Sequence, residues 1–316
     1  MIPHPTPFLA PPTAYADPAT SAVAILPVPY EGGISWGRGA ALGPQAVIEA
    51  SAELEMYDEA LRFETCRMGI TTLAFPEDLS SPEAMVSSVR HATRDILDRG
   101  LFPVLLGGDH SVSIGFFRAL CEVYPSPSVI HIDAHADLRE SYQGNPLSHA
   151  CVMARIREHT SNTLQIGIRS LCAEEDERIQ REDLCVCTME EYRAGTFDLP
   201  SAIRRLPDPV YLSLDVDALD WSVVRSTGTP EPGGFLWHET LELVRTLYRE
   251  RDVIAFDLVE LSQAPPDRNG AFAVAKLLYK MLGLKLSSHV LRGRAEWPTA
   301  PEGPILGQAP LPASHM

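Results

Sequence analysis

Residues 129–138 of this chain read VIHIDAHADL, a β-branched apolar run that ends abruptly in ionisable side chains. A run of this kind is typical of a strand buried on both faces of a parallel sheet. Because alternate residues of extended chain point the same way, Asp133, His135 and Asp137 are expected to converge on one spot. Carboxylates beside a buried strand need a metal, a cationic partner or water. The stretch therefore predicts either a metal site or a strand end with solvated acids.

Similar apolar runs alternate with amphipathic stretches along most of the chain. Strands are expected at 22–28, 102–106, 129–132, 163–168, 210–214 and 252–258. Helices are expected at 44–57, 81–100, 112–122, from 148 onward, and at 173–182, 238–250 and 271–283. This alternation predicts an α/β fold with a mostly parallel central sheet and helices on both of its faces.

Proline-rich segments flank the predicted core. Residues 1–21 are expected to form an extended arm, wrapped on a surface or disordered, and 291–316 a tail outside the core. No internal repeat or linker divides 22–290, which we interpret as one domain. The glycine-rich segment 31–44 lacks the G-x-G-x-x-G pattern of dinucleotide sites, so we expect a loop over a ligand pocket or a subunit contact.

The charge balance restricts the possible partners. The chain has 26 basic and 42 acidic residues, a formal net charge of −16 and a sequence pI near 5.0. This excess of acid argues against nucleic acid and anionic membranes as partners and suits a cationic substrate. The six cysteines form no C-x-x-C pair, and the sequence shows neither a signal peptide nor a membrane-spanning apolar run. We therefore expect a cytoplasmic protein.

Potential metal ligands follow three of the expected strands, and Glu260 follows a fourth. The ligands are His110, Asp133, His135, Asp137, Asp215 and Asp217. Open α/β sheets bind ligands at the carboxyl ends of their strands, so these side chains are expected to share one cleft. Two histidines with four aspartates suit a pair of divalent ions. The carboxylates favour Mn²⁺, with Ni²⁺, Fe²⁺ or Co²⁺ as alternatives, over a structural Zn²⁺ site.

Several segments together resemble the ureohydrolase family, which includes arginase and agmatinase. They read GGDHS (107–111), DAHAD (133–137), SLDVDALD (213–220), GRGAALGPQAVIEAS (37–51), SHA (148–150), TGTPEPGG (227–234) and FDLVE (256–260). They follow the family's order and span most of the chain between about 22 and 284. The resemblance implies an arginase-like three-layer α/β/α fold, a two-manganese centre, and a homotrimer or homohexamer.

The resemblance also implies which side chains hold each metal. One ion would take His110, Asp133, Asp137 and Asp215. The other would take Asp133, His135, Asp215 and Asp217. Asp133 and Asp215 would bridge the two ions together with a hydroxide, while Asp109 and Ser111 would orient ligands from behind.

Catalytic roles follow from the chemistry of a guanidinium carbon, which needs a strong nucleophile. Two metals about 3.5–4 Å apart can supply hydroxide at neutral pH. By resemblance, Asp137 would also hydrogen-bond that hydroxide, and Glu260 would hold the guanidinium cation through paired hydrogen bonds. His149 is expected to protonate the leaving amine.

The predicted substrate is agmatine, giving urea and putrescine. Arginases carry Asn where this chain has Arg139, and Asp where it has Cys172, so arginine is disfavoured. SHA, FDLVE and the loop containing Thr229 look more like agmatinases, and Glu140 offers a negative charge to a dication. Arg139, Glu140 and Thr229 are the expected contacts to the rest of the substrate.

Other substrates stay open. N1-aminopropylagmatine is a competitor, because the loop that begins DLRE resembles that branch of the family. Guanidinobutyrate could use Arg139 as a carboxylate partner, and guanidine is a more distant alternative. A metal-binding homologue without enzymatic activity is the alternative from another class, although all six ligand positions and Glu260 are present.

Overall fold

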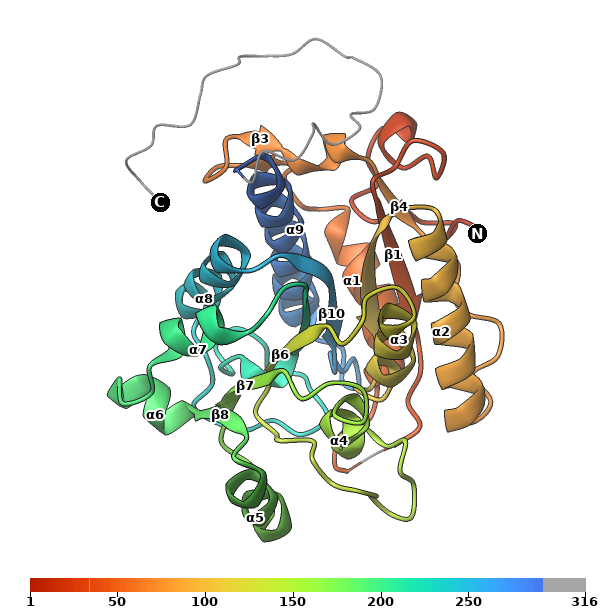
Figure 1. The fold of residues 1–316 in the computed structure, drawn as a ribbon. Coiled ribbons are helices and arrows are strands. Elements are labelled where there is room, and N and C mark those ends of the chain that lie inside the picture. Colours follow the sequence, from red (N-terminus) through yellow and green to blue (C-terminus); the bar gives the residue numbers. More distant parts are fainter. Residues whose placement is uncertain (34, 292–316) are drawn as a thin grey trace.

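The computed structural model describes residues 1–33 and 35–291. Its centre is an eight-stranded sheet in which every neighbouring pair runs parallel, in the order β4-β1-β5-β10-β9-β6-β7-β8 (Figure 1). The strands are β1 (Val23–Val28), β4 (Ile70–Thr72), β5 (Phe102–Gly107), β6 (Ser128–Ile132), β7 (Thr163–Ile168), β8 (Cys185–Thr188), β9 (Val210–Asp215) and β10 (Val253–Val259). The expected parallel α/β fold is confirmed.

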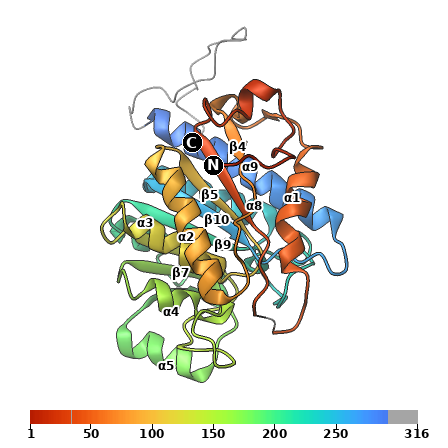
Figure 2. The same ribbon diagram turned by 90° about the vertical axis from the view of Figure 1, so that its right-hand side faces the viewer.

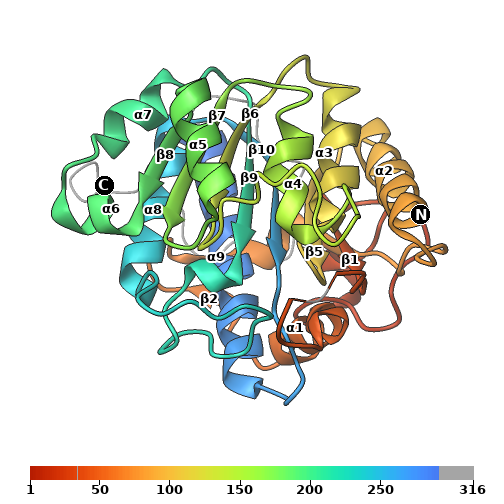
Figure 3. The same ribbon diagram turned by 90° about the horizontal axis from the view of Figure 1, so that it is seen from below.

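Helices cover both faces of this sheet, as Figures 2 and 3 show. One hydrophobic cluster joins the sheet to α1 (Gly43–Ser51), α7 (Leu199–Arg205), α8 (Trp237–Glu250) and α9 (Arg268–Leu291). A second cluster joins the opposite face to α2 (Pro82–Asp98), α3 (Val112–Cys121) and α4 (Val152–Ile156). The short helices α5 (Ala173–Glu182) and α6 (Met189–Ala194) lie near the β8 edge (Figure 3). Three layers result, with an apolar core on each side of the sheet.

Local sequence explains most of the predicted elements. All residues of β1, β5, β6, β7, β9 and β10 are buried, as their continuous apolar runs require. Helix α2 begins where Ser81 accepts a hydrogen bond from the Ala84 N–H and Pro82 occupies the first turn. Gly100, with φ of +71°, follows the helix in the left-handed conformation that glycine adopts easily.

Some expected boundaries are wrong. Helix α1 ends at Ser51 and not near 57, because the chain turns into a hairpin of β2 (Tyr57–Asp58) and β3 (Phe63–Glu64). Helix α9 begins at Arg268 and continues to Leu291, well past the predicted end. Strands β4 and β8 and helices α6 and α7 were not predicted, since each is too short to show a clear hydrophobic period.

The N-terminal arm packs against the domain's own core. Phe8 and Leu9 are 0% and 2% exposed. Their amides donate to the side chains of Thr72 and Ser51, and a short 3-10 turn at Thr13–Tyr15 follows. The arm thus contributes apolar burial and is not merely laid on a surface. Of the predicted tail 291–316, Leu291 is the last residue of α9, and 292–316 lie outside the described residues.

The strand order brings the predicted ligand segments together. Strands β5, β10, β9 and β6 are consecutive neighbours in the middle of the sheet. Because they run parallel, the segments after them meet at one edge, and these segments carry His110, Glu260, Asp217 and Asp133. Within 1–33 and 35–291, no helix is both long and apolar enough to cross a membrane.

Candidate metal centre

His110 lies at the centre of the first cluster of ligand-type side chains. Its Nδ1 atom is 3.2 Å from an oxygen of Asp133, 3.2 Å from one of Asp137 and 3.3 Å from one of Asp215. All four side chains are buried. These are the four residues that the resemblance assigns to one metal ion.

His135 organises the second cluster, which is closer to solvent. Its Nδ1 atom lies 2.9 Å from Oδ2 of Asp217 and 3.6 Å from Oδ1 of Asp133, and its side chain is 24% exposed. Asp133 thus turns one carboxylate oxygen to His135 and the other to His110. One carboxylate shared by two ligand groups is the arrangement that a dinuclear site needs.

The nitrogen and oxygen atoms of these side chains are better placed to bind metal ions than to form hydrogen bonds with one another. His110 Nδ1 and Asp133 Oδ2 are buried, and neither has an aligned hydrogen-bond partner within the described part of the chain. Buried polar atoms without partners are costly, so two of them only 3.2 Å apart indicate a missing ligand. Imidazole nitrogens with carboxylate oxygens fit a divalent ion such as Mn²⁺. The cluster is therefore a metal-binding site.

Crowding shifts the pKa values of these side chains in different directions. Burial, Asp217 and Asp133 raise the pKa of Asp215 well above its usual range, and burial with Asp133 also raises the pKa of Asp217. Burial opposes the charge on Asp133 as well, but its histidine neighbours hold its pKa well below normal. Burial would lower the pKa of His135, yet Asp217 and Asp133 raise it to about 12. Without metal, protons bound to the cluster would take over part of the charge compensation.

A buried relay orients His110 from behind. Its Nε2 atom lies 2.9 Å from the Ser213 hydroxyl, which donates to the buried carboxylate of Asp257 at 3.0 Å. Asp257 also accepts hydrogen bonds from the Tyr211 and Ser113 hydroxyls. A serine that donates to Asp257 accepts from the imidazole N–H, so Nδ1 of His110 is left free to bind metal. Ser213 and Asp257 stood in two quoted motifs but received no role from sequence alone.

Glu260 follows β10 at the same edge. Its Oε1 atom accepts a hydrogen bond of 2.7 Å from the backbone N–H of His110. Burial and the nearby Asp109 raise its pKa well above the usual range. Both Glu260 and the predicted ligand Asp137 adopt positive φ, +68° and +52°, which is costly for residues other than glycine. Such strain is typical of functional positions.

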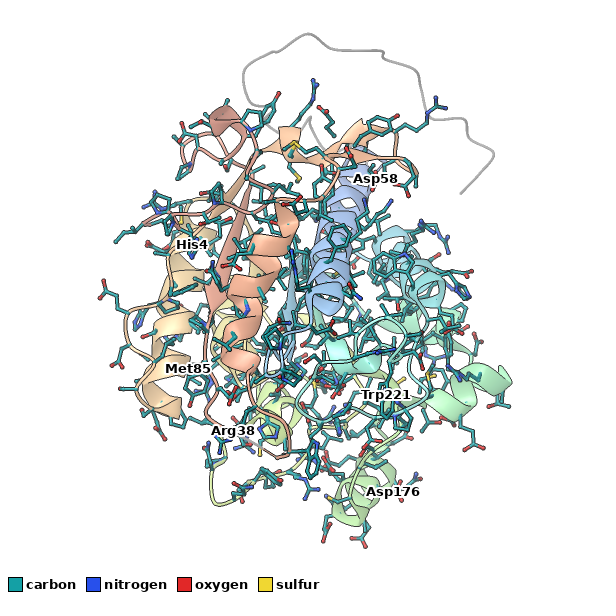
Figure 4. All side chains as sticks on the ribbon, turned by 180° about the vertical axis from the view of Figure 1, so that it is seen from behind. His4, Arg38, Asp58, Met85, Asp176 and Trp221 are labelled. Carbon is teal, nitrogen blue, oxygen red and sulfur yellow. The ribbon has the colours of Figure 1, made fainter. Side chains whose placement is uncertain are left out.

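His149 is held between two loops that are distant in sequence. Its Nε2 atom lies 2.9 Å from the Ser35 hydroxyl and its Nδ1 atom 3.3 Å from the Ser148 hydroxyl, while Tyr142 contacts the ring edge-on. Asp109 holds the first loop by accepting hydrogen bonds from the N–H groups of Gly32 and Gly33. These contacts give Asp109 a role beyond the predicted one, because they fix the loop beside His149. Arg38, farther along this loop, lies at the end of the molecule remote from Asp58 (Figure 4).

Arg169 was not assigned a role from sequence, yet it ties together several parts of the site. Its guanidinium donates to the carbonyl oxygens of Asp217 (2.6 Å), Glu231 (2.9 Å) and Pro232 (3.1 Å). The Glu231 carboxylate lies 3.9 Å from Nε2 of His135. Arg169 thus anchors the 227–234 loop to a predicted metal ligand. Planar, multiple donation of this kind is particular to arginine.

The expected contacts to the rest of the substrate are less well supported. Glu140 is exposed and forms ion pairs with Arg155 and Arg178, which leaves little uncompensated charge for a substrate. Arg139 lies over the Tyr142 ring, 5.5 Å from its centre, and 3.9 Å from Glu175.

The two remaining positions singled out from sequence lie at a loop and at a helix start. Thr229 is half-buried in the 227–234 loop, next to Gly228, where an added Cβ would lie 3.3 Å from the Glu260 carboxylate. Cys172 forms the N-cap of α5. The backbone N–H of Cys172 donates to the Glu175 carboxylate, which closes the first turn of α5.

Known proteins are similar to this chain over most of its length. The sequence model of the Arginase family matches residues 21–283. The N(1)-aminopropylagmatine ureohydrolase of Synechocystis sp. is 37% identical, covering 86% of this chain and 90% of that protein. The agmatinase of Pyrococcus horikoshii is 33% identical, covering 82% and 90%. The crystal structure of agmatine ureohydrolase from Thermoplasma volcanium matches with a TM-score of 0.79 at 26% identity, covering 86% and 92%. This chain belongs to the arginase family.

Proposed function

We propose that this protein is an agmatinase-like ureohydrolase, which hydrolyses agmatine to urea and putrescine with two divalent metal ions. As a member of the arginase family, it is a hydrolase of guanidino carbon–nitrogen bonds. The observation that carries the proposal is the convergence of two histidines and four aspartates in two groups that share Asp133. Glu260 follows strand β10 beside them and accepts a hydrogen bond from the His110 backbone N–H.

Metal ions at this site would supply one part of the chemistry. When bound, two divalent ions lower the pKa of a water so that it can attack a guanidinium carbon at neutral pH. We propose Mn²⁺ as the native metal, with Ni²⁺, Fe²⁺ and Co²⁺ as alternatives, because carboxylates outnumber imidazoles among the ligands. His110, Asp133, Asp137 and Asp215 would hold one ion. Asp133, His135, Asp215 and Asp217 would hold the other.

Glu260 is proposed to bind the guanidinium cation. One of its carboxylate oxygens is already fixed by the His110 amide, so the carboxylate is oriented before substrate arrives. A cation brought beside this buried group would restore its ionised form and gain charge-assisted hydrogen bonds. A planar guanidinium matches a carboxylate through two parallel N–H donors.

His149 is proposed to transfer a proton to the departing amine. Ser35 and Ser148 hold both ring nitrogens, so the ring is oriented at a site that two loops enclose. Imidazole changes its charge near neutral pH, which suits a group that must give and regain a proton in each cycle. Ser35 also contacts the Tyr142 hydroxyl, which provides a polar path toward the surface.

N1-aminopropylagmatine is the second candidate substrate. Four similar relatives, at 33–37% identity, carry the name N(1)-aminopropylagmatine ureohydrolase. Both candidate substrates end in an amine, and Arg139 and Glu140 are engaged with other side chains. An acidic guanidino substrate such as guanidinobutyrate is therefore disfavoured. We further propose a cytoplasmic homotrimer or homohexamer that binds neither nucleic acid nor membranes.

The test is urea release after removal of metal and reloading with Mn²⁺ or Ni²⁺. Agmatine, N1-aminopropylagmatine, arginine, guanidinobutyrate and guanidine should be compared by kcat/KM. We expect one of the two amines to exceed the other substrates at least tenfold. A preference for arginine or guanidinobutyrate, or no urea from any of the five, would refute the proposal.

Glu260→Gln tests the guanidinium site within the same assay. The variant should keep two bound metals but lose several kcal/mol of transition-state stabilisation, on the order of 10²-fold or more in kcat/KM. Glu242→Gln on the exposed face of α8 is the matched control and should behave like the unmodified enzyme. Full activity of Glu260→Gln would show that another group binds the guanidinium.

A further inference from the structure

His131 is a buried histidine beside the metal centre that neither the motifs nor the proposed reaction uses. It lies on β6 two residues before Asp133 and is 0% exposed. Its Nε2 atom is 2.9 Å from Oδ2 of Asp133 and 3.9 Å from Oδ2 of Asp137, and its ring stacks on that of His110. By position alone, His131 could be an additional metal ligand or a hydrogen-bond donor to Asp133.

Gln165 decides between these two roles. It is paired with His131 across β6 and β7, and its side-chain nitrogen lies 2.8 Å from the carbonyl oxygen of Ala136. A carbonyl oxygen only accepts hydrogen bonds, so the atom facing it must be the amide NH₂ and not the amide oxygen. The same nitrogen lies 3.1 Å from Nδ1 of His131. An NH₂ group only donates, hence Nδ1 must accept and the ring proton must sit on Nε2.

We infer that the Gln165–His131 pair is a positioning device for Asp133, the carboxylate that both metal groups share. With the proton on Nε2, His131 places this N–H nitrogen 2.9 Å from Asp133 Oδ2 and has no lone pair on it for a metal ion. The contact is close but not aligned as a hydrogen bond, and neither atom has a hydrogen-bond partner elsewhere among the described residues. The inference rests on the proposed metal centre and assigns a function to two residues outside its ligand set.

This arrangement has a specific consequence for the metal centre. A bridging carboxylate can rotate between bidentate and monodentate binding, and a fixed donor on one oxygen restricts that rotation. Loss of such outer hydrogen bonds typically weakens metal binding about 10–100-fold without removing a ligand. If His131 were itself a metal ligand, replacing it would instead remove one ligand from the coordination shell of the metal.

The test compares His131→Leu, His131→Gln and Gln165→Met with the unmodified enzyme. Bound Mn²⁺ at saturation, Mn²⁺ affinity in chelator buffers and the visible spectrum of the Co²⁺-loaded protein should be measured together with kcat and KM. We expect His131→Leu to bind two ions at saturation with about 10–100-fold weaker affinity. His131→Gln, which can still present an N–H near the Nε2 position, should recover most of that loss. Gln165→Met should weaken binding less than His131→Leu.

Two results would overturn the inference. If both His131 variants saturate with fewer ions and their Co²⁺ spectra show a lower coordination number, His131 is a ligand. If affinity, spectra and kcat stay unchanged in all three variants, the pair has no role at the centre. His91→Leu, on the exposed side of α2, controls for loss of a histidine. These metal measurements stand even if no substrate releases urea, so failure of the proposed function remains distinguishable.

Discussion

Single side chains at this site are controlled by the groups that surround them. Asp133 illustrates the point, because one of its oxygens faces His110 and His131 while the other faces His135. DAHAD marks Asp133 as a candidate ligand, and the family resemblance implies that it is shared by both metals. In the structure, three histidines surround it: His131 in β6, and His110 and His135 in the segments after β5 and β6. The residue type thus determines that Asp133 can bind metal, and the surrounding histidines determine which way each of its carboxylate oxygens faces.

His149 provides the sharpest prediction for a single residue. His149→Ala should lower kcat about 10²–10⁴-fold, because a positioned general acid typically contributes that much. Metal content should be unchanged, and added imidazole should restore part of the rate. His238→Ala, on the exposed side of α8, is the control. Loss of metal from His149→Ala would place this residue in the metal centre and contradict the proton-transfer role.

At the scale of structural elements, Arg169 connects the segment after β9 to the 227–234 loop. Replacing it by Met should free the 227–234 loop, since three carbonyl groups from two segments lose their donor. We expect KM for the guanidino substrate to rise about tenfold, with weaker binding of the second metal ion. Steady-state kinetics and metal titration would show this. Arg181→Met, in an exposed position on α5, should change neither quantity.

Elements differ in how far sequence predicts them. The long apolar runs of β1, β5, β6, β7, β9 and β10 predicted buried strands, and the structure confirms them. The edge strands β4 and β8 were not predicted, because three or four residues are too few to show a hydrophobic period. Helix α1 was predicted too long, since the hairpin that ends it depends on Tyr57–Glu64 pairing.

For the whole molecule, the pKa values predict how stability depends on pH when metal is removed. The pKa of His135 rises to about 12, so the folded state binds more protons than the unfolded state above about pH 6.5. Its contribution to stability is complete below that pH and is lost as pH rises. The raised pKa values of Asp215 and Glu260 likewise make the folded state less stable as pH rises. The lowered pKa of Asp133 affects stability only in acid.

The expected outcome is therefore a falling melting temperature for the chelated protein as pH rises from about 6.5 to 9. The Mn²⁺-loaded protein should be more stable throughout, and its advantage should grow with pH, because metal competes with protons for the same atoms. Calorimetry at three pH values with chelator and with Mn²⁺ checks both statements. A melting temperature of the chelated protein that rises over this range would contradict the assignment.

Assembly is a further property of the whole chain. The proposed homotrimer or homohexamer predicts a species of three or six times the 34.7 kDa chain mass in sedimentation equilibrium at micromolar concentration. A monomer under these conditions would refute it. Phe8 and Leu9 of the arm at 1–21 are buried in the chain's own core, so these two side chains are not available for a subunit contact.

The sequence by itself determined the fold class and the residues that can bind metal. Apolar runs ending in aspartate or histidine are local features, and parallel strands place such ends on one edge wherever they fall in the sheet. Only the tertiary structure decided which groups meet. Ser35 reaches His149 across 114 positions, and Arg169 reaches Asp217 and Glu231 across 48 and 62. Such contacts depend on strand order and loop paths, and no local period of the chain encodes them.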